Sequence, residues 1–200
     1  MSKALFALPF LALALVAARP APAPAPAPMA SLAAPAAVAA DPANTLTLEL
    51  STGGKVVIQM RPDLAPHHVE RIQKLVRQGF YNGLAFHRVI PGFMAQSGDP
   101  KGTGEGGSSL PDLKAEFSSL PFLRGTVGAA RTADNPNSAN SQFFIMYVPM
   151  MSFEGQYSAW GRVVSGMAAV DTIAPGEPPE QPTKIVRAYL GDAAAAAAAK

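Results

Sequence analysis

The first regular pattern in the chain is an alternation of leucine with polar residues over Thr45–Leu50. A period of two residues places every second side chain on the same face, which is typical of a half-buried β-strand. The turn-forming residues Ser51–Gly54 follow, and Lys55–Met60 supplies a second strand-like run. Together these segments predict a β-hairpin.

Two other segments show the spacing of helices. After Pro66, apolar residues recur three and four positions apart, and Gly79 stands where such a helix would stop. The recurring residues are Val69, Ile72, Leu75 and Val76. Proline is tolerated in a first helical turn and glycine is common just past a last one, so we expect a helix between them. A second helix fits Gly166–Ile173 and ends before Pro175.

The central stretch Phe86–Asp99 reads as a strand, a turn at Pro91-Gly92 and a further strand. Other strand-like runs follow at Thr126–Ala130, Phe143–Tyr147, Ala159–Val164 and Lys184–Leu190. Many short strands with two separated helices favour a mostly β fold, with a closed antiparallel sheet rather than βαβ units.

The two ends of the chain differ from its middle. Lys3 followed by the apolar stretch Ala4–Ala18 is typical of an export signal and is shorter than most membrane spans. We therefore divide the chain into a signal peptide (1–18), an Ala/Pro-rich linker or leader (19–44), a folded domain (45–192) and a low-complexity Ala tail (193–200). Repeated proline disfavours helix and strand and favours an extended linker.

This division predicts a periplasmic or secreted protein with no stable membrane insertion after processing. Cleavage after Ala18, cleavage after Ala40 and an uncleaved anchor all remain open. The chain contains no cysteine, which excludes a bacterial lipoprotein, a disulfide frame and a thiolate metal site.

Charge gives no support to binding of nucleic acid or a membrane surface. Between Thr45 and Asp192, 13 Lys and Arg residues balance 13 Asp and Glu residues. His67 and His68 near a helix start lack the spacing of a zinc site, and we expect both to be solvated on the helix face. No metal and no cofactor is expected.

The most unusual residue of the central stretch is Arg88, a permanent cation set within an apolar run. An arginine beside a hydrophobic face commonly extends its charged end into water, and that interpretation suffices for Arg88 alone. Strict alternation would place Phe86, Arg88 and Ile90 on one face and His87 and Val89 on the other. A bulge or a strong local twist would then be needed for Arg88 to reach a wet groove.

Two stretches of the sequence, taken together, indicate a family. Phe86-His87-Arg88-Val89-Ile90-Pro91-Gly92-Phe93-Met94-Ala95-Gln96-Ser97-Gly98-Asp99 resembles the signature of the cyclophilins, the prolyl cis-trans isomerases. Asn137-Ser138-Ala139-Asn140-Ser141-Gln142-Phe143-Phe144-Ile145 resembles the second signature of the same family, at the expected distance downstream. The resemblance extends from about Thr45 to Leu190.

The resemblance implies an eight-stranded antiparallel barrel, closed and capped by a helix at each end, with the substrate in a groove on its outer wall. It implies catalytic roles for Arg88, Phe93 and Gln96. It implies substrate-binding roles for Met94, Ala130, Arg131, Gln142, Phe144, Phe153 and Tyr157. Arg88 would stabilise the twisted amide, Gln96 would hold the substrate carbonyl directly or through water, and Ala130 would pair its backbone with an extended peptide.

Each of these residues also has a purely structural interpretation. Phe93, Phe144 and Phe153 are also compatible with ordinary core aromatics, and Gln142 with a structural amide. The Gly102–Gly107 stretch formally matches the dinucleotide-binding pattern, but no helix follows it. We expect it to be a loop beside the groove, where glycine permits close approach of a substrate backbone.

Departures from the best-known cyclophilins matter as well. Arg131 stands where many eukaryotic members have Asn, and Ala-Arg-Thr is similar to the bacterial exported subgroup. Met151 and Ser152 fill the neighbourhood of the tryptophan that contacts cyclosporin, whereas the only tryptophan of the chain is Trp160. The resemblance therefore implies weakened cyclosporin binding with turnover retained.

The function implied is that of a prolyl isomerase, most simply a monomer, whose partners are proline-containing unfolded or extended polypeptides. Two other functions stay open. One is a catalytically weak peptide-binding chaperone module that uses the same groove. The other is a tethered scaffold in which the Ala-Pro arm matters more than the groove.

Overall fold

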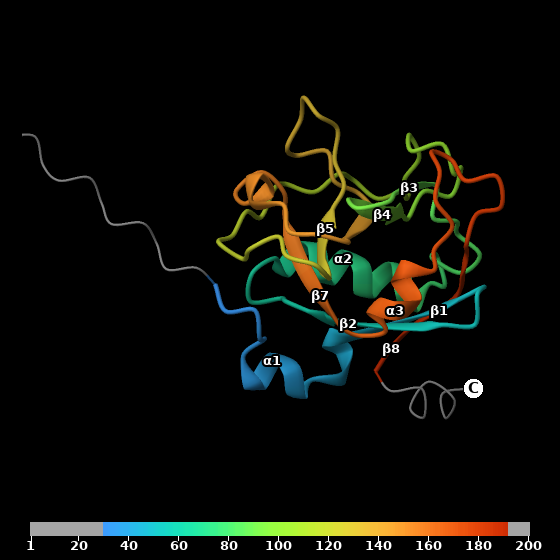
Figure 1. The fold of residues 1–200 in the computed structure, drawn as a ribbon. Coiled ribbons are helices and arrows are strands. Elements are labelled where there is room, and N and C mark those ends of the chain that lie inside the picture. The colour runs from blue at the N-terminus through green and yellow to red at the C-terminus, as the bar shows by residue number, and fades with distance from the viewer. Residues whose placement is uncertain (1–29, 192–200) are drawn as a thin grey trace, which may run out of the picture.

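The computed structural model describes residues 30–191, which form a mostly β structure around one curled sheet (Figure 1). The helices are α1 (Ala36–Ala40), α2 (Pro66–Arg77) and α3 (Met167–Asp171), with short 3₁₀ turns at Pro42–Asn44 and Met151–Phe153. The strands are β1 (Thr45–Leu50), β2 (Lys55–Met60), β3 (Arg88–Ile90), β4 (Met94–Ser97), β5 (Thr126–Ala129), β6 (Phe143–Met146), β7 (Ala159–Ser165) and β8 (Ile185–Leu190). Within the described range these eight strands form one sheet in the order β3-β4-β6-β5-β7-β2-β1-β8, and every ladder is antiparallel.

The expectation of a closed barrel is wrong, because the sheet is an open, curled half-barrel. Its edges are β3 and β8, and no ladder joins them within residues 30–191. The isolated bridges Ala85↔Lys184 and Val89↔Gly176 cross the gap between the two edges. The outward backbone N–H and C=O of Val89 in β3 are bonded to Gly176, so the chain between α3 and β8 covers this edge in place of β8. Covering an edge in this way keeps its backbone groups from pairing with another chain.

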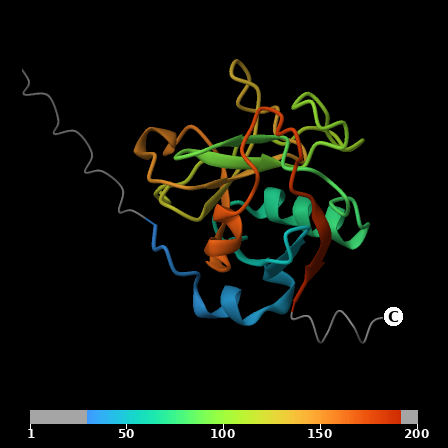
Figure 2. The same cartoon turned by 45° about the vertical axis from the view of Figure 1, so that its right-hand side comes forward.

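The predicted helices are present and cover the inner face of the sheet. Val69, Ile72, Leu75 and Val76 of α2 are buried in the main core. Pro66 occupies the first turn of α2, and the chain leaves the helix through Gly79, whose φ is +69°. In both views, the β3–β4 hairpin lies in the upper half of the molecule and α1 lies at its lower end (Figures 1 and 2).

The segment expected to be an extended linker contains helix α1 where the structure describes it. Residues Ala36–Ala40 hold no proline, Pro35 is the residue before the helix, and alanine has the highest intrinsic helix propensity. This stretch is attached to the domain, since Asn44 donates to the Val38 carbonyl at 3.1 Å and Arg61 donates to the Ser31 carbonyl at 2.8 Å. The proposed signal peptide and the Ala tail lie outside the described residues.

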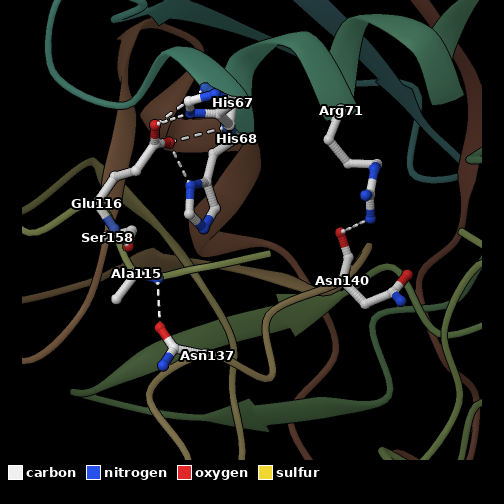
Figure 3. A network of polar contacts seen from close by, with 8 residues as sticks. All are labelled: His67, His68, Arg71, Ala115, Glu116, Asn137, Asn140 and Ser158. Atoms are coloured by element: carbon white, nitrogen blue, oxygen red, sulfur yellow. Dashed lines mark hydrogen bonds and ion pairs between the residues drawn. The ribbon is translucent and has the colours of Figure 1, made fainter. Parts of the chain in front are cut away.

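A carboxylate ties the long loop before β5 to the start of α2 (Figure 3). Glu116 accepts the backbone N–H groups of His67 and His68 at 3.1 and 3.0 Å, and both ring Nδ1 atoms at 2.6 Å. Ser158 holds the same loop by accepting the Glu116 N–H at 2.8 Å. An anion is favourable at this position because the first N–H groups of a helix have no partner within the helix.

The expectation that both histidines are solvated is therefore wrong for His68, which is only 2% exposed. Burial lowers the pKa of His68, and this outweighs the opposing effect of Glu116. Burial would raise the pKa of Glu116, but the bonds from His68 and His67 outweigh it and lower that pKa. At neutral pH the pair is thus a carboxylate and a neutral imidazole whose Nδ1–H donates to it.

Candidate active site

Four consecutive strands of the sheet carry the candidate site in a single row of the register. Arg88 of β3 pairs with Gln96 of β4, Gln96 pairs with Phe144 of β6, and Phe144 pairs with Gly128 of β5. Residues in such a row project to the same face of a sheet. Strand pairing alone therefore brings β4 and β6, which are nearly fifty residues apart in sequence, side by side.

The side chains next to this row point to the opposite face of the sheet, which explains why the Arg88 side chain lies outside the core. Val89, Ala95, Ile145 and Val127 are all buried in the main core on the inner face. β3 begins only at Arg88, so Phe86 lies before the strand and is buried without obeying its alternation. The bulge that strict alternation would require is unnecessary.

A second apolar cluster covers the outer face and forms a pocket of about 240 Å³, here called the aromatic pocket. Its lining residues are Arg88, Phe93, Met94, Gln96, Ala130, Arg131, Phe144, Phe153 and Tyr157. Nine of the ten residues that the sequence analysis assigned to catalysis and substrate binding thus surround one pocket. Their grouping is a feature of the structure, while their individual roles stay predictions.

The tenth residue, Gln142, lines an adjoining hollow of about 390 Å³, here called the polar hollow. The two spaces share Gln96, Ala130 and Arg131, so they form one groove. The polar hollow is also lined by Gly104–Ser108, which places the glycine-rich loop beside the groove as predicted.

Ring contacts fix the walls of the aromatic pocket. Phe153 lies 5.8 Å from Phe93, 5.9 Å from Phe144 and 4.4 Å from Tyr157, measured between ring centroids. Phe122, which is 1% exposed, contacts Phe144, Phe153 and Tyr157 from below. A wall of mutually packed rings keeps its shape when empty, which suits it to an apolar ligand ring.

Gly128 leaves the space that the ring of Phe144 fills. A Cβ atom at position 128 would lie 2.5 Å from Phe144 Cζ and 2.9 Å from Phe122 Cε1. Sequence reasoning passed over Gly128 and Phe122. A glycine inside a strand often indicates that a neighbouring group approaches closely, so the sequence could have indicated Gly128. No local sequence pattern indicates that Phe122 supports the pocket.

Hydrogen bonds orient the amide of Gln96. Its Nε2 donates to Gln142 Oε1 at 2.8 Å, and Gln142 Nε2 donates to the carbonyls of Gly104 and Gly106 at 2.8 and 2.7 Å. A primary amide has two N–H groups, so Gln96 keeps a donor for a ligand. The Ala130 N–H is bonded to the Gln142 carbonyl at 3.0 Å, and its own carbonyl is therefore the group it offers to a peptide.

The two arginines of the aromatic pocket differ in how their charge is used. Arg131 stacks on the Tyr157 ring at 4.5 Å and donates to the carbonyls of Gln156 and Thr132, which makes it part of the wall. Arg88 donates through Nε to Glu177 Oε2 at 2.7 Å, and its side chain is 42% exposed. A guanidinium has five N–H donors, so four remain on its terminal nitrogens.

Beneath this surface, Asp99 shapes the glycine-rich loop and His87 is buried uncharged. Burial would raise the pKa of Asp99, but bonds from backbone N–H groups, including those of Lys101 and Gly104, outweigh it and lower that pKa. Burial lowers the pKa of His87 despite the nearby Asp99. His87 therefore adds no positive charge beside that of Arg88.

No group of three or more His, Cys, Asp or Glu residues able to hold a metal ion occurs among residues 30–191. Over the same range, no helix has the length and apolar character needed to cross a membrane.

Comparison with known proteins agrees with the geometry. The family model for the cyclophilin type peptidyl-prolyl cis-trans isomerases matches residues 45–190. A probable peptidyl-prolyl cis-trans isomerase of Brucella suis is 55% identical over 170 residues, covering 77% of this chain and 86% of that protein. Peptidyl-prolyl cis-trans isomerase B of Bacillus subtilis is 35% identical over 128 residues, covering 64% and 89%.

Solved structures give the same result. The cyclophilin AquaCyp293 from Hirschia baltica superposes with a TM-score of 0.69 at 32% identity, covering 75% of this chain and 74% of that one. A cyclophilin type peptidyl-prolyl cis-trans isomerase of Cryptosporidium parvum, solved in the presence of the dipeptide Ala-Pro, superposes with a TM-score of 0.68 at 25% identity, covering 74% and 99%.

Proposed function

Since the chain belongs to the cyclophilin-type peptidyl-prolyl cis-trans isomerases and is an enzyme of that class, we propose that its outer groove is where the isomerisation takes place. Arg88 is the residue that stabilises the transition state. The observation that carries this assignment is the pairing of Arg88 with Gln96 at the rim of a pocket walled by packed rings.

The chemistry needs no covalent intermediate. Rotation about a peptide bond must overcome a barrier of roughly 18–20 kcal/mol because amide resonance is lost. As the Xaa-Pro bond twists, the proline nitrogen becomes pyramidal and regains a lone pair. A donor aimed at this lone pair stabilises the twisted state more than the planar one, which is the requirement for catalysis. Arg88 suits the task because a guanidinium remains charged at any physiological pH.

The other residues of the groove hold the substrate while it turns. The proline ring packs in the aromatic pocket against Phe93, Met94 and Phe144. Gln96 holds the carbonyl before proline with its remaining N–H, directly or through water. The Ala130 carbonyl pairs with the peptide backbone, and the polar hollow accommodates residues that flank the proline. The substrates are accordingly unfolded or extended chains in which an Xaa-Pro bond is accessible.

We further propose that the protein acts outside the cytoplasm, in the periplasm or after secretion, as a monomer. The support for export is the Lys3 and Ala4–Ala18 pattern of the sequence. The folded part then encounters newly exported chains, which are extended and in which Xaa-Pro bonds populate both cis and trans isomers.

The test is cis-to-trans exchange of a short Ala-Pro peptide, followed by NMR with the full chain and with its Arg88→Ala variant. Loss of a charge-assisted hydrogen bond of about 1.5–3 kcal/mol predicts a fall in kcat/KM of roughly 10- to 150-fold, with peptide binding retained. Equal acceleration by both proteins would remove Arg88 from the centre of the mechanism. Binding without acceleration by the wild type would favour the chaperone-module function instead.

A further inference from the structure

The chain that covers the open edge of the sheet places an acidic residue directly on Arg88. Val89 and Gly176 exchange both backbone hydrogen bonds, at 2.8 and 2.9 Å, in an antiparallel bridge. In that register the next opposed pair is Arg88 and Glu177, and the Arg88 Nε is 2.7 Å from Glu177 Oε2. Glu177 comes from a segment 89 residues away in sequence and does not line the aromatic pocket.

The segment around Glu177 is constrained by its own sequence. Gly176 has a φ of +142°, and a Cβ atom there would lie 2.5 Å from Pro179 Cα, so only glycine fits the turn. Pro178 and Pro179 each fix one backbone torsion angle. Thr183 closes the segment by accepting the Ala174 N–H at 3.1 Å. The carboxylate is therefore presented by a backbone with little freedom to move.

We propose that Glu177 is a positioning residue for the isomerisation. It binds the Nε side of the Arg88 guanidinium, and the four N–H groups on the terminal nitrogens are left for the pocket. Arginine has a long side chain with substantial rotamer entropy, and Arg88 is 42% exposed. Without a partner it would sample many orientations, of which few aim a donor at the proline nitrogen. The inference rests on the proposed role of Arg88 and assigns no contact between Glu177 and the substrate.

The competing interpretation is an ordinary surface ion pair, and the chain supplies a matched control for it. Arg124 and Asp171 form a similar pair at 2.6 Å with side chains 45% and 46% exposed, against 42% and 51% for Arg88 and Glu177. Arg124 and Asp171 line a different hollow and neither of the two spaces of the groove. If only surface ion pairing matters, removing either acid has the same effect on catalysis.

The experiment compares Glu177→Ala, Glu177→Gln and Asp171→Ala in the full chain, with the Ala-Pro peptide at subsaturating and saturating concentrations. An exposed pair that orients a reacting group predicts a fall in kcat of about three- to five-fold for Glu177→Ala, with KM within about two-fold of wild type. Glu177→Gln recovers most of the loss, because its amide oxygen still accepts the Nε–H. Asp171→Ala retains the wild-type kcat.

A second measurement separates positioning from general stabilisation. In an Arg88→Ala background, Glu177→Ala has no further effect on exchange, because residues acting as a unit are non-additive. An equal loss in that background overturns the proposal, as does a wild-type kcat for Glu177→Ala or an equal loss for Asp171→Ala. If Arg88→Ala itself retains full activity, the proposed mechanism fails together with this inference. A collapse in Arg88→Ala with unchanged Glu177→Ala overturns the inference alone.

Discussion

Replacing Glu116 with alanine tests how the long loop before β5 is attached to α2. Two of the four bonds that Glu116 accepts come from backbone N–H groups at the helix start, and losing such a cap costs about 1 kcal/mol. The buried His68 Nδ1–H also loses its acceptor, and an unpaired buried donor costs about 1–3 kcal/mol. The His67 ring is 74% exposed, so its bond is disregarded. The sum is about 2–4 kcal/mol, with a middle value of about 3 kcal/mol.

Thermal unfolding followed by circular dichroism measures this loss. For a domain of this size, about 3 kcal/mol corresponds to a fall in Tm of about 6–12 °C. The control is Glu70→Ala, which removes an exposed glutamate of α2 and is expected to change stability by less than about 0.5 kcal/mol. Exchange activity well below Tm should match wild type, since Glu116 does not line the groove. Equal Tm values for the two variants would refute the argument.

Three further outcomes are expected. On acidification, Tm should fall first below about pH 6.5, because the lowered pKa of His68 leaves it protonated in the unfolded chain but not in the folded one. Tm should fall further below about pH 4.5, because the folded pKa of Glu116 is also lowered. Unfolding curves from pH 4 to 8 that coincide would contradict this. Gly128→Ala should lower stability by about 1–3 kcal/mol through overpacking against Phe144 and weaken peptide binding, and a titration with unchanged Kd would show that the pocket absorbs the methyl group. Cyclosporin should bind weakly while turnover is retained, since Trp160 is 1% exposed and packed in the core; a nanomolar Kd by calorimetry would disprove it.

The sequence predicted the strands because their spacing and turns are local patterns, whereas the site residues were assigned through the resemblance to the cyclophilins. Strand spacing and the turn at Pro91-Gly92 define the β3–β4 hairpin, and its register alone sets Arg88 opposite Gln96. Closure of the sheet was not open to the same reasoning. It depends on which distant segment pairs with the outer edge of β3, and here Gly176 rather than β8 takes the backbone groups of Val89.

The structure differs from the sequence-based expectations in two other ways. Some contacts join segments that are remote in sequence, and one helix lies in a segment whose overall composition disfavours helices. His68 lies on a helix whose periodicity gives no sign that Glu116, 48 residues later, covers it. The pairing of Glu177 with Arg88 likewise has no local signal. Helix α1 was missed because the proline content of residues 19–44 concealed a proline-free run at Ala36–Ala40.

The row formed by Arg88, Gln96, Phe144 and Gly128 has a consequence for how the enzyme acquires its own activity. Arg88 and Gln96 come from one hairpin, whereas Gly128 and Phe144 lie much further along the chain, and pairings between distant segments form late because the segments must first be brought together. No fragment of the sheet contains a working groove. A prolyl isomerase of this fold therefore becomes active only after its own long-range contacts are complete, and recovery of turnover on refolding is a direct reporter of its native topology.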